Sequence, residues 1–112
     1  MENVVSIWIG KTNSVNELNE YVKENYNEEG EMNSLFMKDF KIEFYDENFR
    51  ESLFSIENNP FKLFSYSDFL IQHLGEIRIE NNNSFIFIYN FSYDKSVLKS
   101  KNFKFIGSYD YQ

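Results

Sequence analysis

Cysteine is absent from this sequence of 112 residues, and histidine occurs only once, at His73. Without thiols the chain cannot form disulfides, thiolate zinc sites, iron–sulfur clusters or a cysteine nucleophile, and one imidazole cannot build a multi-histidine metal site. Glycine occurs four times, at scattered positions, so neither of the common glycine-rich phosphate loops is present. The sequence therefore indicates no metal and no cofactor, and nucleotide binding is not expected.

Long apolar runs and an excess of basic charge are lacking as well. No segment approaches the roughly 18 apolar residues of a membrane-spanning helix, and the first residues lack the basic start and the length of a signal peptide. The 11 Lys and Arg are outnumbered by 18 Asp and Glu, which gives a formal net charge of -7. Nucleic acid and anionic membranes would repel such a chain. We therefore expect a cytoplasmic protein with a basic protein partner, and no nucleic-acid or membrane partner.

The patterns of catalytic sites are also missing. Ser108 follows Gly107, but no G-x-S-x-G elbow surrounds it, and His73 falls on the apolar face of an expected helix, as a core histidine would. Among 18 carboxylates some pair will reach the separation of about 5 to 9 Å that glycoside hydrolysis uses, by chance alone. We therefore predict no catalytic residues and no enzymatic activity, with a small carboxylate-dependent enzyme as the less favoured alternative.

Aromatic residues, by contrast, are abundant. The chain has 13 Phe, 8 Tyr and one Trp, which together make up 20% of the sequence. Each ring buries roughly 150 to 250 Å², so half of them suffice for a substantial core without disulfides or metals. The length fits one domain over residues 1–112.

Three apolar segments predict strands. Residues 4–9 and 85–91 are apolar on both faces, which is typical of strands inside a sheet. Residues 103–109 alternate, which predicts a strand with one fully buried face. The expected faces are Phe103, Phe105 and Tyr109 on one side and Lys104, Ile106 and Ser108 on the other.

Helices are predicted between these strands. Ser14 and Glu17 form a capping box that starts a helix over residues 15–25, and Asp46 is a good cap for a second helix. The apolar positions of that second helix are Phe49, Leu53 and Ile56.

Two regions remain ambiguous in the sequence. After Ser34, residues 35–40 fit a short helix, whereas residues 42–45 alternate as a short strand would. A further helix opens at Ser67, and residues 76–80 fit either its continuation or a strand of a hairpin. The order of strand, helices and strands predicts an α+β two-layer sandwich, with a mostly antiparallel sheet and helices packed on one face.

The acidic excess lies in the first half of the chain. Residues 1–60 hold 13 acids and 5 bases, and residues 24–57 alone hold 10 acids and 3 bases. Such a cluster is either a solvated face or a docking surface, and an aromatic ring amid charge often anchors an interface. The partner-binding residues that we predict are Asp39, Glu43, Tyr45, Asp46 and Glu47.

Specific strings along nearly the whole chain carry a family resemblance. They are Val5-Ser6-Ile7-Trp8-Ile9-Gly10, Lys38-Asp39-Phe40 with Tyr45-Asp46-Glu47 and Phe49, Ile88-Tyr89-Asn90-Phe91 with Tyr93-Asp94, and Phe103-Lys104-Phe105-Ile106-Gly107-Ser108-Tyr109 with Tyr111. With these strings the chain resembles the immunity protein 22 family of bacterial toxin systems. The resemblance implies a protein that binds and neutralises a cognate toxin, often a nuclease, inside the producing cell. The alternative is a regulatory domain that binds another basic protein.

Overall fold

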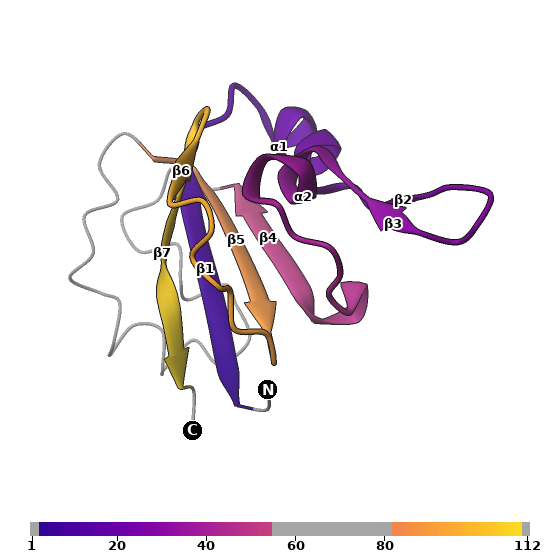
Figure 1. Cartoon of the computed structure of the whole chain (residues 1–112). Coiled ribbons are helices and arrows are strands. Elements are labelled where there is room, and N and C mark those ends of the chain that lie inside the picture. The colour runs from indigo at the N-terminus through magenta and orange to yellow at the C-terminus, as the bar shows by residue number, and fades with distance from the viewer. Residues whose placement is uncertain (1–2, 55–81, 111–112) are drawn as a thin grey trace.

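A computed structural model of the chain describes residues 3–54 and 82–110. One antiparallel sheet has the strand order β4-β5-β1-β7-β6, two helices pack against one of its faces, and a separate two-stranded hairpin projects outward (Figure 1). The predicted α+β class is therefore confirmed. In chain order the elements are β1 (Val4–Gly10), α1 (Val15–Val22), β2 (Asn25–Tyr26), β3 (Met32–Asn33), α2 (Leu35–Phe40), the 3-10 helix η1 (Glu47–Phe49), β4 (Arg50–Phe54), β5 (Ser84–Tyr89), β6 (Lys99–Ser100) and β7 (Phe103–Asp110).

The two most apolar strands lie inside the sheet, as their sequences predict. β1 pairs with β5 on one side and with β7 on the other, and β5 lies between β1 and β4. Every residue of β5 is buried, as are residues 5–10 of β1. Because both faces of these strands are buried, apolar side chains are needed at successive positions.

Trp8 lies at the centre of the core between the sheet and the helices. Its side chain is fully buried, and its ring centroid lies 4.9 Å from that of Phe36 on α2. It also contacts Tyr93 and Phe105, at centroid distances of 5.4 and 5.1 Å. These contacts agree with the buried position predicted for residues 4–9. They join α2, the loop after β5 and strand β7 in one aromatic cluster around Trp8.

Both helices begin at serine caps. The Ser14 hydroxyl accepts the backbone N–H of Glu17 at 3.1 Å, and the Ser34 hydroxyl caps α2 in the same way. α1 ends at Val22, three residues before the predicted end, because Lys23 has extended backbone angles that lead into β2. The serine caps correctly predicted where both helices start, whereas the pairing of β2 with β3 determines where α1 ends.

The ambiguous region after α2 is an irregular loop. Lys41 ends the helix in the left-handed conformation, with a φ of 55°, and the backbone N–H of Ile42 donates to the carbonyl oxygen of Met37 at 2.9 Å. Beyond this cap Ile42 and Tyr45 are buried, whereas Glu43 and Phe44 are exposed. The helix alternative for residues 35–40 is therefore confirmed, and the strand alternative for residues 42–45 is wrong.

The helix predicted after Asp46 is wrong beyond one turn. The Asp46 carboxylate accepts the backbone N–H of Asn48 at 3.0 Å and caps only η1. The next residues form β4, in which Leu53 lies opposite Phe85 of β5. The backbone pairing offered by β5 thus overrides the four-residue spacing of Phe49 and Leu53. The predicted helix at Ser67, His73 and residues 76–80 all lie outside the described residues.

A β-bulge in β7 inverts the predicted alternation of its side chains. The register with β1 shifts at Ile106, which is an extra residue on β7. Phe103 and Phe105 pack in the helix-side core, but Tyr109 and Ile106 pack against the opposite face of the sheet. The prediction that Tyr109 shares a face with Phe103 and Phe105 is wrong, because one added residue moves every later side chain to the other face.

Truncating Trp8 should destabilise the whole domain. We expect Trp8→Ala to lower the free energy of unfolding by about 3 to 5 kcal/mol, since it removes a fully buried ring from an aromatic cluster. Trp8→Phe keeps a ring in place and should cost much less. Chemical denaturation measures both variants, and an unchanged unfolding midpoint in Trp8→Ala would contradict the core assignment.

Candidate partner-binding surface

Exposed carboxylates gather on the hairpin β2–β3 and on the loop from α2 to β4. Within residues 24–54, six acids and only two basic residues are exposed. Figure 1 shows the hairpin extending away from the sheet and the helices. The exposed acids are Glu28, Glu29, Glu31, Glu43, Asp46 and Glu47, and the exposed bases are Lys38 and Lys41.

The tip of the hairpin is a defined turn. The side-chain oxygen of Asn27 accepts the backbone N–H groups of both Glu29 and Glu31, each at 2.9 Å. Gly30 has a φ of +82°, a left-handed conformation that a residue with a Cβ adopts at a cost. The turn that holds the acidic residues is therefore encoded by the sequence itself. The sequence analysis did not predict this hairpin.

The base of the hairpin is tied to η1. The hydroxyl of Tyr26 donates a hydrogen bond to the carboxylate of Glu47, and this bond raises the pKa of Tyr26 to about 12. Tyr26 is nevertheless 54% exposed, so most of its ring faces solvent. The hydrogen bond brings the two acidic segments side by side.

Glu24 is buried, and it links the hairpin and the loop before β4 to the sheet. Its carboxylate accepts hydrogen bonds from Nε and Nη2 of Arg50, at 2.8 and 2.7 Å, and another from the hydroxyl of Tyr45. The side chain of Glu24 is 5% exposed. Burial alone would raise the pKa of Glu24, but the hydrogen bonds from Arg50 and Tyr45 outweigh it and lower the pKa. Glu24 is thus an ionised structural residue that is unavailable to a partner.

Tyr45 was predicted as an interface anchor, and the structure places it in the core. It is 2% exposed, and its ring packs against Phe36 and Phe91 with centroid distances of 6.5 and 6.3 Å. The exposed aromatic residues of this loop are instead Phe44, at 68%, and Phe49, at 41%. The two buried positions of this loop, Ile42 and Tyr45, are three residues apart, which an alternating pattern could not reveal.

Asp39 is partly buried near the end of α2. Its carboxylate accepts a hydrogen bond from the hydroxyl of Tyr21 at 2.9 Å and lies 3.8 Å from Nζ of Lys101. Burial and this hydrogen bond raise the pKa of Tyr21. Asp39 therefore has partners within the chain, unlike Glu43, which makes no hydrogen bond or ion pair with any residue that the structure describes.

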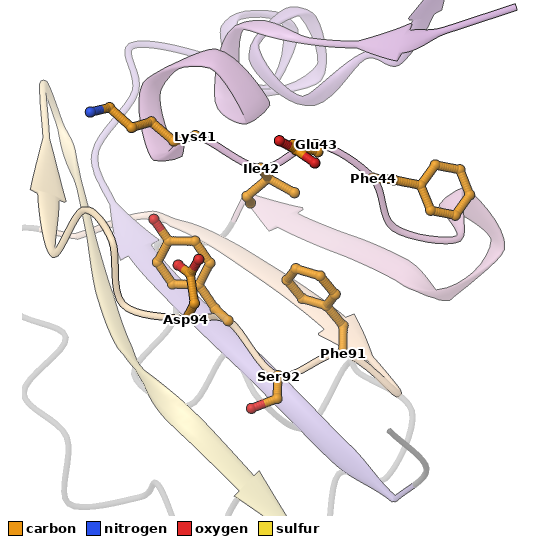
Figure 2. A pocket seen from close by; sticks show the side chains of 8 residues that line it. Lys41, Ile42, Glu43, Phe44, Phe91, Ser92 and Asp94 are labelled. Atoms are coloured by element: carbon orange, nitrogen blue, oxygen red, sulfur yellow. The ribbon is translucent and has the colours of Figure 1, made fainter.

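An open depression of about 450 Å³ adjoins the acidic loop. Its walls come from residues 41–44, which follow α2, and residues 91–94, which follow β5. Figure 2 shows the carboxylate of Glu43 above Ile42, that of Asp94 to the lower left of Ile42, and the ring of Phe91 below Ile42. The depression thus combines apolar surface with two acids from distant parts of the sequence.

The described ranges lack two other kinds of functional feature. Within residues 3–54 and 82–110 no group of three His, Asp or Glu residues could hold a metal ion. In the same ranges no helix is long and apolar enough to cross a membrane. The acidic surface and its adjoining depression are therefore the candidate partner-binding features.

These features define a small α+β domain with an exposed acidic surface. A family model described as Immunity protein 22 matches residues 5–112, and the chain therefore belongs to that family. Neither a curated protein nor a solved structure matches the chain. Membership confirms the resemblance carried by the sequence strings and gives the chain the role of an immunity protein, which binds a cognate toxin.

Removing the charge of Glu24 should weaken the domain at neutral pH. We expect Glu24→Gln to lower the free energy of unfolding by about 2 kcal/mol, because it breaks charged hydrogen bonds to Arg50. Glu28→Gln, on the exposed hairpin tip, should change it little. Denaturation at pH 7 measures both, and equal stabilities would contradict the structural role of Glu24.

The Glu24–Arg50 pair also predicts how the stability of the domain depends on pH. Because the folded-state pKa of Glu24 lies below its ordinary value of 4.5, its contribution to stability is complete above that pH and is lost as the pH falls through the lowered pKa. The stability difference between the wild type and Glu24→Gln should therefore shrink below pH 4.5. A constant difference would contradict the pKa assignment.

Proposed function

We propose that this immunity protein neutralises a basic toxin, such as a nuclease, in the cytoplasm of the producing cell. The proposed contact surface consists of the exposed acids of hairpin β2–β3 and of the loop from α2 to β4. The observation that supports it is the concentration of six exposed acids, against two exposed lysines, within residues 24–54. We propose that the protein acts by occupying the toxin and not by catalytic turnover.

Charge complementarity supports a basic partner. A nuclease must present positive charge to phosphate, and an acidic surface that meets this charge gains a high association rate. The edge of the sheet opposite β4, around β6, has the opposite charge, because the exposed bases there outnumber the exposed acids. These bases are Lys95, Lys99, Lys101 and Lys104. A dipole of this kind would orient the protein with its acidic hairpin toward a basic toxin (Figure 1).

Exposed rings beside the acids supply the apolar contacts that charge alone does not. Phe44, Phe49 and Tyr26 are each more than two-fifths exposed on the same two segments. Interfaces usually gain most of their affinity from a few such anchors, whereas charges at the rim contribute mainly to the association rate. Among the predicted acids we therefore expect Glu43, which has no bonded partner among the described residues, to contribute more than Asp39, which already has partners within the chain.

Charge reversal on this surface should slow the association with the toxin. We expect Glu43→Lys and Glu47→Lys to lower the association rate and its dependence on salt, since steering acts over a Debye length of about 8 Å at physiological ionic strength. Any fully desolvated acid should cost more than about 2 kcal/mol of binding free energy. Surface plasmon resonance at several salt concentrations, with the cognate toxin as the binding partner, measures both quantities.

Two variants separate charge from stability in this experiment. Asp46→Asn removes the charge but keeps an oxygen that can cap η1, and Asp110→Lys makes the same charge reversal at the end of β7, away from the hairpin. Asp110→Lys should have a much smaller effect than Glu43→Lys. Equal effects of all reversals would mean that only the net charge matters. Unchanged kinetics in all of them would place the toxin contacts elsewhere.

A further inference from the structure

We infer that the depression between residues 41–44 and residues 91–94 receives an arginine side chain of the partner. The inference rests on the proposed function, which it makes specific by naming the chemical group that is bound. The depression holds about 450 Å³, near the lower end of the range of roughly 300 to 1,000 Å³ for ligand pockets. It therefore suits an inserted side chain.

One wall of the depression is anchored to the central strand. The hydroxyl of Ser6, fully buried on β1, donates to the carbonyl oxygen of Phe91 at 2.6 Å and accepts the backbone N–H of Tyr93 at 3.0 Å. The hydroxyl of Tyr93 in turn donates to the carbonyl oxygen of Phe40 at the end of α2. Residues 91–93 are thus held in place before any partner arrives, which lowers the entropy cost of binding.

The opposite wall is fixed by the end of α2. The left-handed cap at Lys41 and the hydrogen bond from Ile42 to Met37 direct the chain so that Ile42 is buried and Glu43 is exposed. In Figure 2 the Lys41 side chain extends away from Glu43 and Phe91. The lysine on this wall therefore leaves the carboxylate of Glu43 without a cation among the described residues.

The charge of the depression favours a cation. Asp94 accepts the backbone N–H and the hydroxyl of Ser96 through a single oxygen, Oδ1, so its second oxygen remains for a ligand. Those hydrogen bonds lower the pKa of Asp94, which keeps it ionised at neutral pH. Glu43 adds a second negative charge from the opposite wall.

The combination of a ring and two carboxylates distinguishes arginine from lysine. A guanidinium is planar, stacks on an aromatic face such as that of Phe91, and offers several N–H donors in a fixed plane. It can therefore contact carboxylates on both walls while its methylene groups cover Ile42. A lysine ammonium is more strongly hydrated and cannot stack in this way.

Titration of the full chain with short peptides tests this inference without the toxin. The probe is acetyl-Gly-Arg-Gly-amide, and the matched control is the same peptide with citrulline, which keeps the shape and removes the charge. Amide chemical shifts in nuclear magnetic resonance spectra should change saturably at residues 41–44 and 91–94, with a dissociation constant on the order of 1 mM. The citrulline peptide should cause no such change.

The double variant Glu43→Gln, Asp94→Asn provides the second arm. Asn at position 94 keeps an oxygen for the Ser96 hydrogen bonds, and Glu43 has no bonded partner among the described residues, so the variant should fold normally. We expect at least a tenfold loss of affinity for the arginine peptide. Shifts spread over all surface acids, equal binding of a lysine or citrulline peptide, or unchanged binding by the variant would each overturn the inference.

Toxin binding by the same proteins separates this inference from the proposed function. If the toxin binds the wild type and the double variant equally well, the arginine site is wrong while the binding role remains. If the toxin does not bind the wild type, the proposed function fails, and the peptide titration still decides whether the depression binds arginine. A loss of toxin affinity in the double variant, together with the peptide result, supports both.

Discussion

The buried ion pair between Glu24 and Arg50 is the interaction on which the arrangement of the surface depends. Glu24 lies between α1 and the hairpin, Arg50 begins β4, and Tyr45, which also bonds to Glu24, belongs to the loop after α2. One carboxylate therefore joins the link before the hairpin to a loop and a strand that lie 21 and 26 residues further along the chain. Breaking such a pair leaves a charge uncompensated in the interior, so the arrangement resists partial opening. The exposed acids lie on the outer side of this junction, in segments that the junction holds together.

Local sequence patterns predicted the parts of the fold that local chemistry determines. The strand around Trp8, the cap at Ser14 and the helix after Ser34 all follow from neighbouring residues. β4 could not be predicted in this way, because Phe49 and Leu53 have helical spacing and only pairing with β5 makes this segment a strand. The bulge in β7 could not be predicted from local sequence either, because it is a shift of register against β1.

The candidate surface was predictable in charge but not in geometry. Counting acids identified an acidic stretch of chain, yet it could not separate Glu24, which is structural, from Glu43, which is exposed. A rare arginine within an acidic stretch, Arg50, was the available signal for a buried pair. The Asp94 wall of the depression lies about fifty residues away in the chain, and hydrogen bonds from its loop to Ser6 on β1 and to Phe40 at the end of α2 bring it near. Contacts over such separations leave no local pattern.

Amide hydrogen exchange of the full chain, with and without the cognate toxin, tests the central claim most directly. Binding through the acidic surface should slow exchange in residues 25–33 of the hairpin and residues 41–49 of the loop, because an interface excludes water from these exposed segments. The strands of the core exchange slowly in either state and serve as the internal reference. Protection confined to the basic region of residues 95–104, with no change in the hairpin or the loop, would contradict the claim.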